Sequence, residues 1–192
     1  MIKKQRQYLL FFVYSLLYII ITHGRKVTVR SDEFIIPNKV KEEDCFYIDD
    51  IINKYQSDEE LIIYFPDEVY DMSLLWHQQN VNIYNNIIFM GNENGTTVFN
   101  YNNDKRGVFH VDVVKDSTYF KVENITFQNF VCNYLAETEI FFVKIKADDF
   151  QFIMDNCTVR NNAYHIFRID VKSTKNHNFD DPYVLIKNTK FM

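Results

Sequence analysis

Six residues recur at matching places in three short segments and could together form a binding strip. The segments are residues 109–113, 141–145 and 167–171, in which apolar residues alternate with the candidates. The six candidates for ligand binding are His110, Asp112, Phe142, Lys144, Arg168 and Asp170. Carboxylate and guanidinium groups hydrogen-bond to sugar hydroxyls, and a sugar face packs on an aromatic plane. The pattern therefore favours a strip that binds polysaccharide. The alternative is a ladder of surface ion pairs, each worth ~0–1 kcal/mol.

Two pairs of adjacent aspartates could supply a metal site or catalytic acids. Asp148-Asp149 and Asp180-Asp181 are separated by the same length of chain as Asn124 and Asn156, so in a repeating fold they stack at one corner. Stacked carboxylates repel unless a cation or a proton lies among them. A Ca²⁺ site with oxygen ligands is one reading, a glycosidase pair ~5 Å apart is another, and solvated turn residues are the third. With Arg168, these four aspartates are the candidate catalytic residues.

The net charge and the number of cysteines limit the kinds of partner and cofactor that the chain is expected to bind. The formal net charge is −5, and acidic residues are mixed with basic ones throughout, so no basic face indicates nucleic acid as a partner. The three cysteines, Cys45, Cys132 and Cys157, are too few for a disulfide scaffold. We expect buried thiols, with a single Cys132–Cys157 bridge as the open alternative. No other cofactor is expected, since no Cys-x-x-Cys or His-x-x-x-His spacing indicates a metal.

A regular repeat identifies the fold class. Each apolar segment of one column opens with an Asn, and the steps between these Asn residues are equal except for a longer first step: Asn86, Asn124, Asn156 and Asn188. Two apolar columns keep step with it: Phe109, Phe141 and Phe167, and Phe120, Phe152 and Val184. No stretch of helical period separates these short strands, which excludes a βαβ sheet. We therefore predict an all-β, right-handed parallel β-helix in which equivalent strands pair in parallel. The Asn column should form a structural ladder at a bend, because Asn tolerates left-handed backbone angles.

The repeat texture also resembles a known group of proteins. Asn-Ile-x-Phe-x-Asn and the segment Asn156-Cys-Thr-Val-Arg-Asn-Asn-Ala163 are similar to the pectate-lyase-like right-handed β-helix superfamily, and to the repeats of chlamydial polymorphic outer-membrane proteins. The resemblance covers roughly residues 60–192 and implies the fold. The enzymatic signatures depart from it: there is no Gly-His-Gly, no Arg adjacent to Pro, and the nearest triplet to Arg-Ile-Lys is Arg168-Ile169-Asp170.

The ends of the chain suggest export and capping. Residues 1–24 read as a signal peptide, with basic residues before an apolar run over residues 8–21; an uncleaved membrane anchor over residues 8–22 is the alternative. Residues 25–60 should form a cap with one strand and a short helix carrying Ile48, Ile51, Ile52 and Tyr55, and residues 61–192 the coils. The last coil is incomplete, so we expect a truncated solenoid or an end covered by another molecule. Asn94 is the expected glycosylation site of a secreted chain; the Asn124 and Asn156 sequons should stay unmodified.

These observations predict a secreted or cell-surface module that binds polysaccharide or a protein partner without catalysis. The alternative is a fragment of a pectate-lyase-like polysaccharide lyase or glycoside hydrolase. A membrane contact is expected only if residues 8–22 are retained.

Overall fold

The structure, a computed structural model, describes residues 24–33, 48–75, 78–131, 139–172 and 182–192. The signal-peptide prediction and the anchor alternative, like Cys45, Cys132, Asp180 and Asp181, therefore lie wholly or almost wholly outside the described residues. Within the described ranges, no helix has the length and apolar character needed to cross a membrane.

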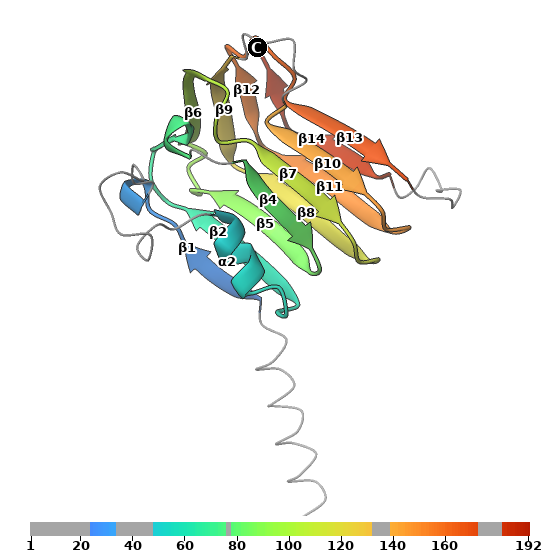
Figure 1. The fold of residues 1–192 in the computed structure, drawn as a ribbon. Coiled ribbons are helices and arrows are strands. Elements are labelled where there is room, and N and C mark those ends of the chain that lie inside the picture. Colours follow the sequence, from blue (N-terminus) through green and yellow to red (C-terminus); the bar gives the residue numbers. More distant parts are fainter. Residues whose placement is uncertain (1–23, 34–47, 76–77, 132–138, 173–181) are drawn as a thin grey trace, which may run out of the picture.

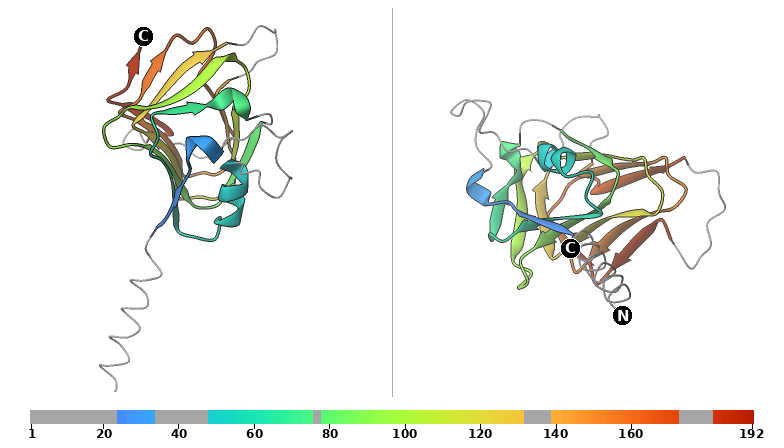
Figure 2. Two further views of the ribbon diagram at one scale, coloured as in Figure 1. Left: turned by 90° about the vertical axis from the view of Figure 1, so that its left-hand side faces the viewer. Right: turned by 90° about the horizontal axis from the view of Figure 1, so that it is seen from below.

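Three parallel sheets wind around one interior (Figures 1 and 2). The side chains buried in this interior form one hydrophobic cluster. The six-stranded sheet contains β1 (Arg25–Thr28), β2 (Glu60–Phe65), β5 (Asn86–Gly91), β8 (Thr118–Glu123), β11 (Phe150–Asp155) and β14 (Val184–Lys187). The four-stranded sheet contains β4 (Gln79–Ile83), β7 (Phe109–Val113), β10 (Phe141–Ile145) and β13 (Phe167–Val171). The five-stranded sheet contains β3 (Val69–Asp71), β6 (Thr97–Asp104), β9 (Ile125–Phe130), β12 (Thr158–Arg160) and β15 (Lys190–Phe191). Successive strands of a sheet come from successive coils, which confirms a parallel β-solenoid. Its right-handed sense stays a prediction.

Period-two burial explains why these segments are strands. In β7 and β10 the first, third and fifth residues are buried and the others half-buried. A strand points alternate side chains to opposite faces, so every second residue enters the interior. The interior is rich in phenylalanine: Phe109 stacks on Phe141 with ring centroids 5.2 Å apart, and Phe120 and Phe127 contact Phe141 edge-on. Aromatic pairs prefer these offset and edge-to-face arrangements.

The predicted register is confirmed in two columns. Phe141 pairs with both Phe109 and Phe167 in the four-stranded sheet. Phe152 pairs with Phe120 and Val184 in the six-stranded sheet. Residues one repeat apart in the sequence are thus neighbours on adjacent coils.

The placement of Asn86 in the Asn column is wrong. Ile87 pairs with Phe120, so Asn86 opens a strand of the six-stranded sheet, whereas Asn124 precedes a strand of the five-stranded sheet. Asn86 instead accepts a hydrogen bond through Oδ1 from the backbone N–H of Tyr119, at 3.1 Å. The longer first step of the column has this cause: the two segments belong to different sheets.

The other three members of the Asn column do lie at a common bend. Asn124, Asn156 and Asn188 have φ values of 58°, 51° and 52°, in the left-handed region that Asn tolerates. Asn156 Nδ2 donates to Asn124 Oδ1 at 2.8 Å. The next step differs, because Asn188 Nδ2 donates to Asp155 Oδ1 at 3.0 Å. The amide ladder therefore passes to a carboxylate after one step.

A helix and one additional strand lie at the first coils of the solenoid. At the first coils, helix α2 (Ile48–Lys54) buries Ile48, Ile51 and Ile52 in the core, and the Ile48 N–H donates to Gln79 Oε1 at 3.1 Å. Strand β1, expected as part of a separate cap, pairs with β2 and is the edge of the six-stranded sheet. Two short 3-10 helices, η1 (Ser31–Glu33) and η3 (Met72–Leu74), complete the described helices.

The last described coil is open. Val171 is 45% exposed and Phe191 55% exposed, although their partners one coil earlier, Ile145 and Val159, are buried. Among the described residues, the core side chains of β13, β14 and β15 therefore pack against the preceding coil only.

Candidate functional site

The six predicted binding residues lie on the outer face of the four-stranded sheet. His110, Phe142 and Arg168 are neighbours on β7, β10 and β13, and Asp112, Lys144 and Asp170 form the parallel row. Strand β4 extends the two rows with Asn80 and Asn82. The sequence repeat was sufficient to predict that these side chains are neighbours.

The ring of Phe142 does not offer a free face to a sugar. His110 stacks on it with ring centroids 4.4 Å apart and planes 29° apart. From the side of β13, Arg168 Cζ lies 5.0 Å from the ring centroid. Lys144 Nζ, on the same strand as Phe142, lies 4.7 Å from the same centroid. Strand β10 runs between β7 and β13, so its neighbours cover both faces of the ring. The expected role of Phe142 as a stacking platform is wrong, and its ring edge forms the wall instead.

The expected ion-pair ladder along Asp112, Lys144 and Asp170 is not formed either. Asp112 Oδ2 pairs with Lys146 Nζ at 2.6 Å, and Asp170 Oδ1 pairs with Arg168 Nε at 3.2 Å. Lys144 points its ammonium group at the Phe142 ring instead. The register is as predicted, but partners within reach on the same or the next strand take the carboxylates.

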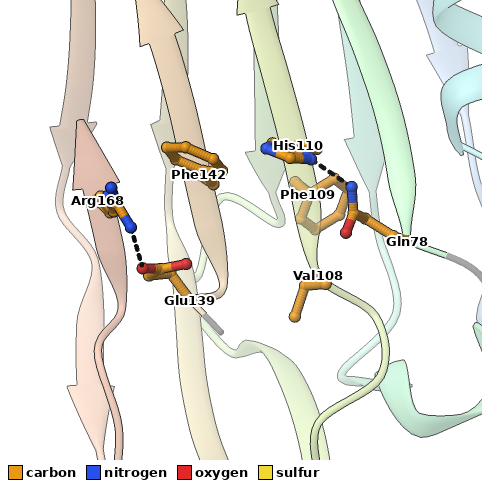
Figure 3. A pocket seen from close by; sticks show the side chains of 7 residues that line it. All are labelled: Gln78, Val108, Phe109, His110, Glu139, Phe142 and Arg168. Carbon is orange, nitrogen blue, oxygen red and sulfur yellow. Dashed lines mark hydrogen bonds and ion pairs between the residues drawn. The ribbon is translucent and has the colours of Figure 1, made fainter. Parts of the chain in front are cut away.

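Three hollows adjoin one another on this face. The first, of about 240 Å³, is lined by Gln78, Val108, Phe109, His110, Glu139, Phe142 and Arg168 (Figure 3). The second, of about 330 Å³, is lined by Glu139, His165, Phe167 and Arg168. The third, of about 140 Å³, is lined by Asn80, Val81, Asn82, His110, Asp112 and Lys144. His110 belongs to the first and third hollows, and Glu139 and Arg168 to the first and second. The hollows thus form one track across the strands.

Glu139 and Arg168 form the wall between the first and second hollows. Glu139 is only 6% exposed, and its Oε1 lies 4.0 Å from Arg168 Nη1. The guanidinium is shared, since its Nε also donates to Asp170. In Figure 3 one Glu139 oxygen is turned to Arg168 and the other points away from it, toward the side of Val108. The wall between the first and second hollows therefore contains a carboxylate and a guanidinium group side by side.

Phe167 supplies the aromatic surface that Phe142 does not. It was expected in the interior file, and it does pack against Phe152, with centroids 6.1 Å apart. Because β13 is the last strand of its sheet, Phe167 is only half-buried and its side chain lines the second hollow. The second hollow thus combines an aromatic wall with Glu139 and Arg168.

His110 forms part of the wall of the first hollow, where its ring is held in place by its neighbours. The side-chain amide of Gln78 donates through its Nε2 to His110 Nδ1. Because His110 Nδ1 accepts, the proton of the neutral imidazole is on His110 Nε2. Nε2 is covered and has no hydrogen-bond partner among the described residues. Burial, with a smaller contribution from Lys144, lowers the pKa of His110, so the ring is neutral near pH 7. A neutral ring held in a stack gives the hollow a rigid side.

The sequence pattern missed Glu139, His165 and Gln78. Glu139 and His165 each precede the first residue of their strand by two positions, and Gly107 holds the same place before β7. Gly107 has φ +72°, and a Cβ there would lie 2.5 Å from the Met72 carbonyl oxygen, so no side chain fills this place. Extending the repeat by two positions upstream of each strand would have revealed the signal.

The aspartate pair at the next corner has turn contacts. The Asp148 N–H donates to Asp116 Oδ1 at 2.7 Å, and Ser117 Oγ donates to Asp149 Oδ2 at 2.9 Å. Neither Asp148 nor Asp149 lines a hollow of the track. Among the residues that the structure describes, no group of three His, Cys, Asp or Glu side chains could hold a metal ion.

The three sequon asparagines differ in their contacts. Asn94 is exposed in a turn beside Gly95, whereas the amide of Asn156 donates to that of Asn124. Cys157 is a buried free thiol, so the Cys132–Cys157 bridge is not formed. Burial raises the pKa of Cys157 to about 11, which leaves it protonated and unreactive.

The protein is thus a parallel β-solenoid with a polar track of three hollows along its four-stranded sheet. Comparison with protein-family models, with curated proteins and with solved structures gives no match.

Proposed function

We propose that this chain is an extracellular module that binds polysaccharide along the outer face of the four-stranded sheet, without cleaving it. The observation that carries the proposal is the track of three adjoining hollows, joined through His110, Glu139 and Arg168. A polymer that crosses the strands contacts several hollows at once. Binding sites commonly combine apolar walls with a few well-placed polar groups, as the second hollow does.

The chemistry of the track suits sugar hydroxyl groups. Acceptors and donors alternate along it: Asn80, Asp112 and Glu139 accept, while Arg168 and Lys144 donate. Among the described lining residues, the acidic side chains Asp112 and Glu139 are balanced by Lys144 and Arg168. A track with no net charge is suited to a neutral, hydroxyl-rich ligand. The resemblance to pectate-lyase-like proteins supports polysaccharide as the ligand; the neutral class rests on the charge balance of the track alone, since pectate carries a carboxylate on each unit.

Binding without cleavage is favoured by the arrangement of carboxylates. Hydrolysis by the usual glycosidase mechanism needs two carboxylates flanking one bond, ~5–9 Å apart. Of the described lining residues, Glu139 is the one carboxylate of the first and second hollows, and Asp112 that of the third. Glu139 faces a guanidinium group instead of a second carboxylate.

The proposal includes secretion, because a protein must leave the cell to bind extracellular polysaccharide. The basic residues and the apolar run before residue 25 support export. N-terminal sequencing of protein recovered from the medium checks it: a mature chain starting near Arg25 is expected, and an intact Met1 on membranes contradicts secretion.

Affinity electrophoresis through gels containing single polysaccharides tests the binding role. Retardation by at least one neutral polysaccharide is expected. Arg168→Ala should raise Kd at least about tenfold and so reduce the retardation, since a charged hydrogen-bond donor to a ligand is worth ~1.5–3 kcal/mol. Arg160→Ala is the matched control, because Arg160 donates to Gln128 on the outer face of a different sheet.

Two outcomes count against the proposal. Equal loss of binding in the Arg168 and Arg160 variants means that the four-stranded sheet is not the binding face. Release of new reducing ends or unsaturated products during incubation shows that the protein cleaves its ligand.

A further inference from the structure

Glu60 begins β2 with one carboxylate oxygen occupied and the other without a partner. Its Oε2 accepts a hydrogen bond from the Tyr119 hydroxyl group. Its Oε1 has no hydrogen-bond or ion-pair partner among the described residues, although the side chain is half-buried. A half-buried carboxylate oxygen has lost part of its contact with water, so a charged donor beside it is stabilising.

The chain segment beside this oxygen is the start of β1. Arg25 pairs with Leu61, so Gly24 lies opposite Glu60 on the neighbouring strand. A Cβ added to Gly24 would lie 2.8 Å from Glu60 Oε1, so the carboxylate approaches the backbone here because residue 24 has no side chain. The Arg25 nitrogen is two covalent bonds from the Gly24 Cα, about 2.4 Å away. Oε1 therefore lies beside the Gly24–Arg25 peptide bond.

The same peptide bond is the expected end of the signal peptide. The apolar run is followed by Thr22 and Gly24, small residues at the third and first places before the bond. When water adds across this amide, the C–N bond breaks, Gly24 leaves with the new carboxylate, and the Arg25 nitrogen becomes an α-amine that is mostly protonated near pH 7. The new ammonium group has three N–H donors and one positive charge, and it forms beside Glu60 Oε1.

We propose that removal of residues 1–24 creates an ion pair between the α-ammonium group of Arg25 and Glu60 Oε1, which fastens β1 to the six-stranded sheet of the mature protein. This inference rests on the secretion part of the proposed function and is independent of polysaccharide binding. A leader peptidase of the export pathway performs the hydrolysis. Strand β1 is the edge of its sheet, so a contact at its first residue opposes fraying of the strand.

The other charged groups near this position already have partners. The Arg25 guanidinium pairs with Asp58. The Lys26 ammonium group lies over the Tyr64 ring, 3.8 Å from its centroid. Neither side-chain cation takes Oε1, and Asp58 is neutralised by the guanidinium, so Glu60 is the carboxylate left for the α-ammonium group.

Acetylation of the α-amine in protein purified from the medium tests the inference. Only the unprotonated amine reacts, and an ion pair keeps it protonated, so the reaction at pH 7 should be slower in wild-type protein than in Glu60→Gln. The expected difference is about two- to fivefold, the size of a partly exposed ion pair. Fragment-ion mass spectrometry of the N-terminal peptide separates the α-amine of Arg25 from the side-chain amine of Lys26.

Glu123→Gln is the matched control, because it removes the same charge from the outer face of the same sheet, where Glu123 pairs with Lys121. This variant should react at the wild-type rate. A measurement on wild-type protein alone covers the case in which Glu60→Gln fails to fold. Salt screens the ion pair, so added salt should speed acetylation of the folded protein more than that of the urea-unfolded protein.

The outcomes separate this inference from the proposed function. An intact Met1 on membranes contradicts secretion, and the ion pair with it. If the secreted chain begins at a residue other than Arg25, or begins at Arg25 and reacts equally fast in wild-type and Glu60→Gln protein, the ion pair is overturned while secretion stands. An equal acceleration in Glu123→Gln also overturns it, because the effect then comes from net charge.

Discussion

Phe141 occupies the centre of the aromatic interior, and its truncation should cost much of the folding free energy. The side chain is 0% exposed. Its ring stacks on Phe109 at 5.2 Å and also contacts Phe120, Phe127 and Phe152, at 5.8, 5.5 and 6.0 Å between centroids. Truncating a buried Phe to Ala costs ~3–5 kcal/mol, and each aromatic pair contributes ~0.5–1.5 kcal/mol beyond its area. Because four ring contacts are lost, we expect Phe141→Ala to cost about 4–5 kcal/mol.

Urea denaturation followed by far-UV circular dichroism measures this loss. The midpoint should fall sharply with the slope unchanged, which indicates lower stability without a change in the surface exposed on unfolding. Phe191→Ala is the control, since Phe191 also points inward but is 55% exposed on the last strand; it should cost less than about 1 kcal/mol. If the two variants lose the same stability, or Phe141→Ala loses less than about 1.5 kcal/mol, the stacked interior described here is refuted.

Four further predictions follow from the bend, the thiol, the imidazole and the open end. Asn156→Ala should lose roughly 1 kcal/mol more than Asn156→Gly in urea denaturation, because only Gly replaces Asn at φ 51° without strain; equal losses would count against a left-handed bend. Cys157, with its pKa raised to about 11, should react with a thiol reagent at pH 8 only after unfolding; fast labelling of folded protein contradicts its burial. Burial lowers the pKa of His110 from 6.5, so the unfolded chain binds more protons than the folded one as pH falls through 6.5. The free energy of unfolding should therefore decrease from pH 7.5 to 5.5 more in wild-type protein than in His110→Gln, and parallel pH profiles would contradict this. Amide hydrogen exchange should be faster in β13 than in β10 and should slow in β13 when polysaccharide is bound; protection confined to other strands would place the ligand elsewhere.

The fold was predictable because its determinant is periodic. Phe109, Phe141 and Phe167 head strands that are paired by a repeat visible in the sequence, and parallel pairing then follows from winding. The Asn column shows where periodicity fails. Asn86 opens an apolar segment like that of Asn124, but identity of pattern does not say which sheet a strand joins. The longer step between these two residues carried the information, since a bend residue must recur at the length of a coil.

The candidate site was predictable in position and not in detail. The rows containing His110 and Lys144 follow from register alone. The cover on the Phe142 ring depends on side-chain conformations across three strands, which spacing does not contain. The hollows likewise depend on several coils at once: the first is lined by Gln78, Glu139 and Arg168, which lie beside three different strands, and spacing does not show that Glu139 is buried there.

The position of the track couples ligand binding to the stability of β13, the last described strand of the four-stranded sheet. Glu139 precedes β10, whose inward residues are fully buried, whereas Arg168 and Phe167 belong to β13, whose residues are only half-buried or exposed. A strand that packs on one side only opens locally at lower free energy than the strands beneath it. A ligand that contacts both Glu139 and Arg168 binds only while β13 is in place, so binding must stabilise that strand by mass action. The same half-burial that makes β13 easy to open also leaves Phe167 accessible to the ligand.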